Sequence, residues 1–220
     1  MLNSGLSRRS FLRTISTASL AWSLSPKMAR GGSGSAPEGG GPAEAKVSVI
    51  KTDYRRKGIR DAISLLELED EFAGKETLIK PNFNTADPFP ASTHNDTLIG
   101  IIEELREREA GSITLGERSG PPPTDEVFED KGIYELAEEL DFELVNFDRL
   151  SEEDLPLQKP KKSHWKDGFR VARPMLESEK IVTTPCLKTH QFGGEFTMSL
   201  KLSVGIVPRE GYSYMNELHS

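Results

Sequence analysis

The sequence predicts an α/β fold with three layers, in which helices cover both faces of a mainly parallel sheet. The first observation is an alternation: from residue 46 onward, short apolar segments typical of strands alternate with segments whose apolar residues recur at helical spacing. The second is that helices separate the strands, so right-handed crossovers would place the strands in parallel. We therefore expect one α/β domain over residues 46–220.

Five segments are expected to form strands, because each is a short run rich in apolar and β-branched residues. In chain order they are 46–51, 76–80, 112–116, 142–147 and 180–185. The spacing of apolar residues predicts helices over 59–66, 98–105 and 133–140. Thr93, with Asp96 three residues later, is expected to cap the second helix. Asp167-Gly168 is expected to form the turn of a hairpin over 164–170.

The N-terminal segment reads as a targeting sequence. Residues 7–13, SRRSFLR, precede a short, modestly apolar stretch and resemble a twin-arginine (Tat) export signal. We assign 1–30 to this signal and 31–45, rich in Gly, Ser, Pro and Ala, to a linker. The protein is then expected outside the cytoplasm, periplasmic or extracellular, and tethered to the membrane if the signal is not cleaved. The Tat translocase would be one partner, and a disordered basic tail is the alternative reading.

Charge and cysteine content exclude two classes of function. The formal net charge of −7 argues against nucleic-acid binding, which needs a basic surface that releases counterions from phosphates. Cys186 is the single cysteine, so this chain alone can form no intramolecular disulfide and cannot ligate an iron–sulfur cluster through four thiolates. A local basic pocket within an acidic protein remains open.

Polar residues follow several of the predicted strands. Lys80 and Asn82 come at the end of the second strand, Glu117 comes after the third, and Lys188-Thr189-His190 comes after the fifth. Ligands of open parallel sheets bind beyond the carboxyl ends of the strands, where such loops meet. We therefore expect these side chains to share one site.

The lysines at this predicted edge suit an anion. Lys80, Lys188 and Lys201 would make an electropositive pocket for a phosphate or carboxylate. Thr93 and the N-terminus of the helix after it would add backbone donors. The alternative is that these lysines are merely solvated ends of strands.

The histidines and the glutamate suggest a second chemistry. His94, His190 and Glu117 could ligate a divalent metal, because imidazole and carboxylate groups bind several such ions. They are scattered along the chain rather than closely spaced, so the metal remains an open alternative to the anion.

Several separated motifs resemble the domain of unknown function 362 family, in the same order along the chain. They are KPNFN, STH, LGERSG, PCLKTH, SLK and VGIVP, and the resemblance runs from about residue 46 to the C-terminus. It implies that the motif positions are Lys80, Asn82, Thr93, His94, Glu117, Lys188, Thr189, His190 and Lys201. Members often carry Tat signals, and some are associated with iron–sulfur ferredoxin modules, for which this chain lacks the cysteines.

The chain departs from the family pattern in two places. Leu202 stands where members usually have Asn, which puts any role of that position in doubt. Members also usually continue past the position of Ser220, so we expect a C-terminally truncated member.

Two functional hypotheses follow. In the first, the protein is an exported enzyme that acts on a small anionic ligand, with His190, His94 and Lys188 as catalytic candidates and a histidine as the acid or base. Lys80 and Lys188 would hold the anion, and Glu117 would orient a histidine or bind metal. In the second, it is a non-catalytic cofactor-binding protein or a redox partner, because no nucleophile elbow, Walker loop or dinucleotide fingerprint is present.

Overall fold

The computed structural model describes residues 45–68, 70–161, 165–189 and 198–209. Its centre is a four-stranded sheet in the order β3-β2-β1-β6, and every neighbouring pair in it is parallel. The strands are β1 (Thr77–Pro81), β2 (Ile113–Glu117), β3 (Glu143–Asn146) and β6 (Lys180–Thr184). The prediction of a three-layer α/β fold is confirmed.

The chain adds strands on both sides of β1, which explains the order of the strands in the sheet. The chain first builds outward from β1 through β2 to the edge strand β3, and then returns so that β6 pairs along the other side of β1. In the pairing of β1 with β6, Leu78 lies beside Ile181 and Lys80 beside Thr183. Because all four strands run the same way, their carboxyl ends lie at one edge of the sheet.

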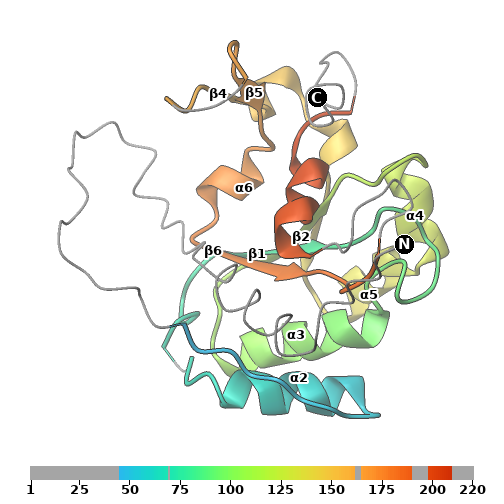
Figure 1. The fold of residues 1–220 in the computed structure, drawn as a ribbon, viewed down its shortest axis with the longest axis vertical. Helices are drawn as coiled ribbons and strands as arrows, with labels where there is room; N and C mark the ends of the chain where they lie inside the picture. The colour runs from blue at the N-terminus through green and yellow to red at the C-terminus, as the bar shows by residue number, and fades with distance from the viewer. Residues whose placement is uncertain (1–44, 69, 162–164, 190–197, 210–220) are drawn as a thin grey trace, which may run out of the picture.

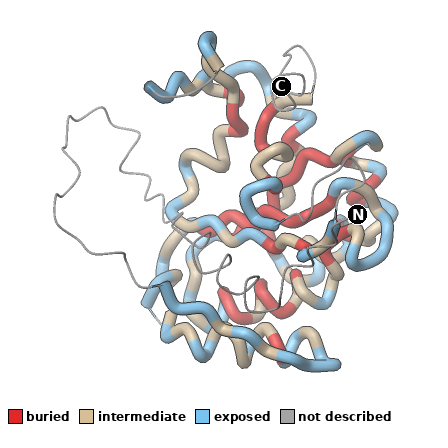
Figure 2. The backbone as a smooth tube through the Cα atoms, in the orientation of Figure 1, coloured by how far each residue is buried: buried red, intermediate tan, exposed pale blue. Residues whose placement is uncertain are grey.

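One face of the sheet is covered by four helices (Figure 1). These are α2 (Arg55–Ser64), α3 (Asn95–Glu107), α4 (Thr124–Asp130) and α5 (Ile133–Glu139). Ile79 and Leu115 from the sheet pack there against Leu98, Ile102 and Phe128 of the helices. The apolar stripes predicted at helical spacing therefore lie in the larger core or pack against it, and Figure 2 shows buried residues in the central strands and in α3.

A second, smaller core covers the opposite face. Leu78, which follows Thr77 and precedes Ile79 on β1, points to this side because successive strand residues alternate. It packs with Phe147, Val171, Ile206 and Val207. The covering elements are η2 (Phe147–Arg149), η3 (Glu152–Asp154), β4 (Leu157–Gln158), β5 (Phe169–Arg170), α6 (Pro174–Glu177) and η4 (Ser199–Ile206).

The prediction of a strand over 46–51 is wrong. These residues have no regular structure, and Val47 and Val49 are 66% and 85% exposed. The segment has the side chains of a strand, but it does not pair with any strand of the described sheet, whose order is β3-β2-β1-β6.

Two local predictions also need correction. The residue that caps α3 is His94 rather than Thr93: its side chain accepts a hydrogen bond from the Asp96 amide. In the hairpin, Gly168 has a φ of 81° and its amide donates to the Trp165 carbonyl, so the turn is present. However, β5 pairs with β4 rather than with the residues just before the turn, and residue 164 lies outside the described residues.

No helix of the described chain is both long enough and apolar enough to cross a membrane. The signal assigned to 1–30 and nearly all of the linker assigned to 31–45 lie outside the described residues, so both assignments stay predictions.

Candidate functional site

A buried ion pair lies at the carboxyl edge of the two central strands. The Lys80 ammonium group, from β1, donates to the Glu117 carboxylate, from β2, and both side chains are only 2% exposed. Lys80 also donates to the Pro81 carbonyl at 2.9 Å. Glu117 accepts two backbone amides, from Phe83 at 3.0 Å and from Arg118 at 2.9 Å. The carboxylate thus joins the ends of both strands.

The helix η4 covers this pair. A Cβ added at Gly205 would lie 2.7 Å from Glu117 Oε1 and 2.9 Å from Lys80 Nζ, so only a glycine lets the backbone of η4 approach so closely. Burial lowers the pKa of Lys80 and raises the pKa of Glu117, while the attraction between the two charges opposes both shifts. The Lys80 ammonium group therefore donates to Glu117 and to the Pro81 carbonyl, and η4 shields it from solvent.

A hydrogen-bonded brace joins the same strand ends to the start of α3. The Thr93 hydroxyl accepts the Asn82 amide at 2.9 Å and donates to the Thr184 carbonyl at 2.7 Å. The Thr93 amide donates to the Asn82 carbonyl at 3.0 Å. Thr93 is buried, so its role here is to hold β1, β6 and the residues before α3 together rather than to cap the helix.

Lys188 is held against the same brace. Its ammonium group donates to the Ala91 carbonyl, which also accepts the Asn82 side-chain amide at 3.3 Å. Lys188 is half-buried, whereas the neighbouring Thr189 is exposed. The predicted meeting of the loop after β1 with the loop after β6 is therefore found in the structure.

Lys201, at the start of η4, lies within electrostatic reach of Lys188. Lys201 is exposed overall, but some loss of hydration around its ammonium group and the positive charge of Lys188 both lower its pKa. Within the described ranges no carboxylate forms an ion pair with either lysine. Neither lysine thus has a described counter-ion.

His94, which directly precedes α3, makes a structural contact at the start of that helix. Its Nδ1 accepts the Asp96 amide at 3.1 Å, which places the proton of the neutral ring on Nε2. The side chain is 42% exposed. His94 can therefore present an N–H group to solvent while it caps α3.

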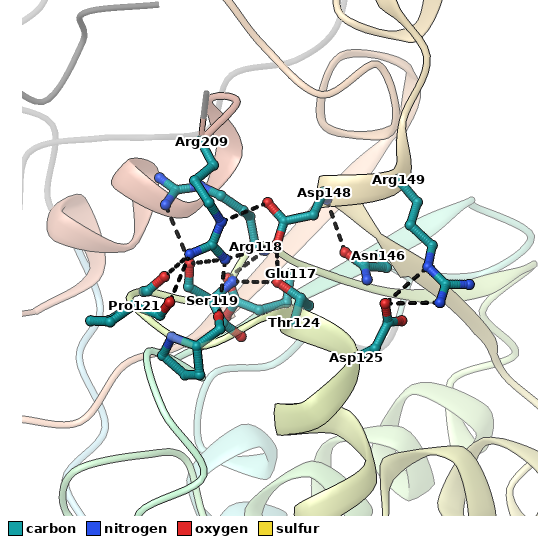
Figure 3. A network of polar contacts seen from close by, with 12 residues as sticks. Glu117, Arg118, Ser119, Pro121, Thr124, Asp125, Asn146, Asp148, Arg149 and Arg209 are labelled. Atoms are coloured by element: carbon teal, nitrogen blue, oxygen red, sulfur yellow. Dashed lines mark hydrogen bonds and ion pairs between the residues drawn. The ribbon is translucent and has the colours of Figure 1, made fainter. Parts of the chain in front are cut away.

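A second polar network occupies the ends of β2 and β3 (Figure 3). The Asp148 carboxylate accepts the Thr124 hydroxyl at 2.7 Å and Arg209 Nη2 at 2.8 Å. Partial burial opposes ionisation of Asp148, but the hydrogen bonds from Arg209 and Thr124 outweigh it and lower its pKa. Burial and the charge of Arg209 lower the pKa of Arg118. This network ties the end of the described chain to the sheet.

Lys131 is a cation that the sequence reasoning missed. It lies between α4 and α5, with its ammonium group 4.7 Å from the centre of the Phe83 ring. Burial lowers its pKa, an effect that the nearby Cys186 thiol opposes. Cys186 itself is buried at 5% exposure. No pattern in the sequence marks a lysine in a loop as the neighbour of a distant aromatic ring.

The described residues do not include a set of side chains that could ligate the predicted metal ion. Among the described residues no group of three or more histidine, cysteine or acidic side chains could hold a metal ion. Glu117 is engaged by Lys80 and two amides, and His190 lies outside the described residues. His94, His190 and Glu117 as metal ligands therefore stay a prediction, as does catalysis by His190.

The structure also contains a cavity that no predicted site residue lines. It measures about 290 Å³ and lies beside the edge strand β3. Its lining residues are Asp125, Phe128, Tyr134, Leu144, Val145, Asn146, Arg149 and Leu150. The cavity and the lysines are therefore separate features of the molecule.

Comparison with known proteins adds one positive finding. No curated protein and no solved structure matches the chain. A family model, described as a domain of unknown function (DUF362), matches residues 77–220. The match begins at β1 rather than near residue 46, and it includes every residue of the predicted site. With most of its length matched, this chain belongs to the DUF362 family.

Proposed function

We propose that this protein binds a small anionic molecule at the carboxyl edge of its sheet, with Lys188 and Lys201 as the cations that contact it. One observation carries the proposal: the Ala91 carbonyl holds the Lys188 ammonium group at this edge, and no described carboxylate forms an ion pair with Lys188 or with Lys201, whose pKa the charge of Lys188 lowers. Like charges at close range repel, and an anion between them would remove that cost.

The surroundings support a preorganised site. The Ala91 carbonyl fixes Lys188, and the bonds of Thr93 to Asn82 and Thr184 make the backbone beneath it rigid. Less reorganisation is then needed when a ligand binds. We assign Lys80 and Glu117 to the support of this edge, because their charged atoms are buried and bonded to one another.

An enzymatic role would draw on His94. A neutral ring with its proton on Nε2 could donate a hydrogen bond to negative charge that develops on a ligand during a reaction. Turnover distinguishes an enzyme from a binding protein. If the protein converts a bound anion into a product and His94→Asn abolishes that conversion, the result would support an enzyme. A ligand that co-purifies unchanged would support the non-catalytic alternative.

Thermal unfolding in the presence of small anions tests the proposal. Because a ligand that binds the native state raises its stability, phosphate or a carboxylate should raise the Tm of the protein. Lys188→Ala and Lys201→Ala should each lose that rise. Lys57→Ala, at an exposed lysine paired with Asp61 on α2, is the matched control and should keep it. Equal shifts in all three variants, or none in the wild type, would refute the proposal.

We further propose export by the Tat route, on the strength of the SRRSFLR segment. Residues 1–45 fused to a folded reporter should carry it out of the cytoplasm. Replacement of Arg8 and Arg9 by lysine should retain the reporter inside, since charge alone does not satisfy a twin-arginine signal. Export that is unaffected by this replacement would contradict the assignment.

A further inference from the structure

We infer that residues 46–51 of one copy of this chain pair along the open edge of β3 in a second copy. The segment is the donor strand, and the edge of β3 with the cavity beside it is the acceptor. This inference does not depend on the proposed anion site. Addition of an extended segment to the edge of a sheet is a common mode of association between proteins.

The donor segment has the side chains of a strand but pairs with no strand of the described sheet. Its Ile50 lies against α2, where Cγ2 is 3.8 Å from the position that a Cβ on Gly58 would take. Val47 and Val49 are instead 66% and 85% exposed, and residues two apart in an extended segment share a side. The segment therefore presents two valines to solvent on one side, and its backbone makes no hydrogen bond to other backbone of the described chain.

The acceptor is an edge strand of the described sheet, because β3 pairs there with β2 alone. In a parallel pair alternate residues direct their N–H and C=O groups to the neighbour, so the residues between them direct theirs to the open edge. Leu144, which packs against the larger core, and Val145, which packs against the smaller one, both line the cavity of about 290 Å³. The cavity thus follows the edge of β3, and with Phe128 and Leu150 it forms an apolar hollow for a valine side chain.

The charges of the two surfaces are complementary. Asp141 and Glu143 are exposed where β3 begins, and neither forms an ion pair with another described residue. The donor segment carries Lys46 and Lys51 and no acidic residue. Opposite charges of this kind favour association and select the partner.

Contacts within one copy do not cancel this attraction. Lys46 pairs with Glu67 at an exposed position, where such pairs contribute little, so the donor segment can give that contact up. At the rim of the cavity Arg149 and Asp125 are bonded to one another (Figure 3), so together they add no net charge.

The other edge of the described sheet lacks this match. The only charged residue of β6 is Lys180, which is already paired with Glu71 and offers nothing to attract the lysines of the donor. No residue of β6 lines the cavity. The acidic edge at β3 is therefore the acceptor.

Sedimentation velocity of the full chain and binding of a labelled peptide test this inference. The chain should self-associate as its concentration rises, and the double variant Val47→Lys, Val49→Lys should stay monomeric. A fluorescein-labelled peptide of residues 45–52 should bind that double variant, because its β3 edge is free. The same peptide with both valines replaced by lysine should bind at least about tenfold more weakly. If mere attraction to an acidic surface were the cause, the two added positive charges would strengthen binding instead.

A charge reversal on each side of the molecule locates the acceptor. Glu143→Lys should weaken both self-association and peptide binding. Glu177→Lys, the same change at an exposed glutamate of α6, is the matched control and should leave both unchanged. Circular dichroism spectra would verify that each variant is folded.

Four results would overturn the inference. They are a chain that stays monomeric at every concentration, a double variant that still associates, a lysine-substituted peptide that binds as tightly as the native one, and association that Glu143→Lys leaves intact. Peptide binding by a chain that never self-associates would show that the segment pairs with β3 of its own copy rather than of a second one.

Discussion

The buried pair of Lys80 and Glu117 gives the sharpest test of the structure. We would make Lys80→Met and Glu117→Gln, singly and together. Removing one partner of a buried ion pair leaves the other charge without compensation and costs about 3–5 kcal/mol. Glu117→Gln should lie at the upper end of that range, because Lys80 would lose its counter-charge and one of the two acceptor oxygens would become an NH2 group, which cannot accept a hydrogen bond. Lys80→Met should lie lower, because the carboxylate keeps the amides of Phe83 and Arg118.

The double variant should be more stable than the sum of the single losses predicts. With no buried charge left, the loss on replacing both residues should fall about 1–3 kcal/mol short of additivity. Urea unfolding followed by circular dichroism measures all four proteins, provided that the m-values agree.

An exposed pair supplies the matched control. Lys57 and Asp61 lie one helical turn apart on α2, and such surface pairs contribute about 0.3–0.5 kcal/mol. Lys57→Met and Asp61→Asn should therefore change stability little. Strictly additive losses below about 1 kcal/mol at Lys80 and Glu117 would show that the pair is hydrated and not covered by η4, which would refute the reasoning.

Four further predictions follow from single contacts. Gly205→Ala should lower the free energy of unfolding by about 1–3 kcal/mol in urea, because its Cβ would fall within 3 Å of the buried ion pair. His94→Ala should cost about 0.5–2 kcal/mol through loss of the α3 cap, whereas His94→Asn should keep most of that stability, so the asparagine variant isolates any chemical role. The pKa of Asp148 is lowered in the folded state, so the stability that its carboxylate contributes is fully present above the unfolded pKa of about 3.9 and is lost as the pH falls towards the lower folded pKa. Arg209→Met should make the Tm fall less steeply over this acidic range, in a series of Tm measurements at different pH values. The pKa of Lys201 is also lowered, so this lysine should lose its charge, and the protein its affinity for anions, at a pH below the usual lysine pKa. In Lys201→Arg, whose guanidinium stays charged, a series of anion titrations should show the decline in affinity only at higher pH.

The pattern of the strands predicted the two cores well. Leu78 and Ile79 are adjacent in an apolar run, and the alternation of side chains along a strand sends them to opposite faces. A run of this kind predicts a strand covered on both sides. The same reasoning failed for 46–51, because a strand also needs a neighbouring strand for its hydrogen bonds, and local sequence does not reveal whether one is present.

The candidate site was predictable in outline only. Polar residues directly after strands of a parallel sheet must share an edge, so the contact of Lys188 with the loop after β1 follows from topology. The burial of Lys80 does not follow. Its position at a strand end suggested a pocket residue, and only the placement of Gly205 against it shows that its ammonium group is covered.

What the sequence determined by itself was the class of the fold, the helical stripes, most of the strands and the edge at which polar loops gather. These features depend on the periodicity of side chains, which is local information. Only the tertiary structure decided the strand order, the pairing of Lys80 with Glu117 and the bonds of Arg209. Each of these depends on which distant segment becomes a neighbour, and that is set by the packing of the whole chain rather than by any short stretch of it.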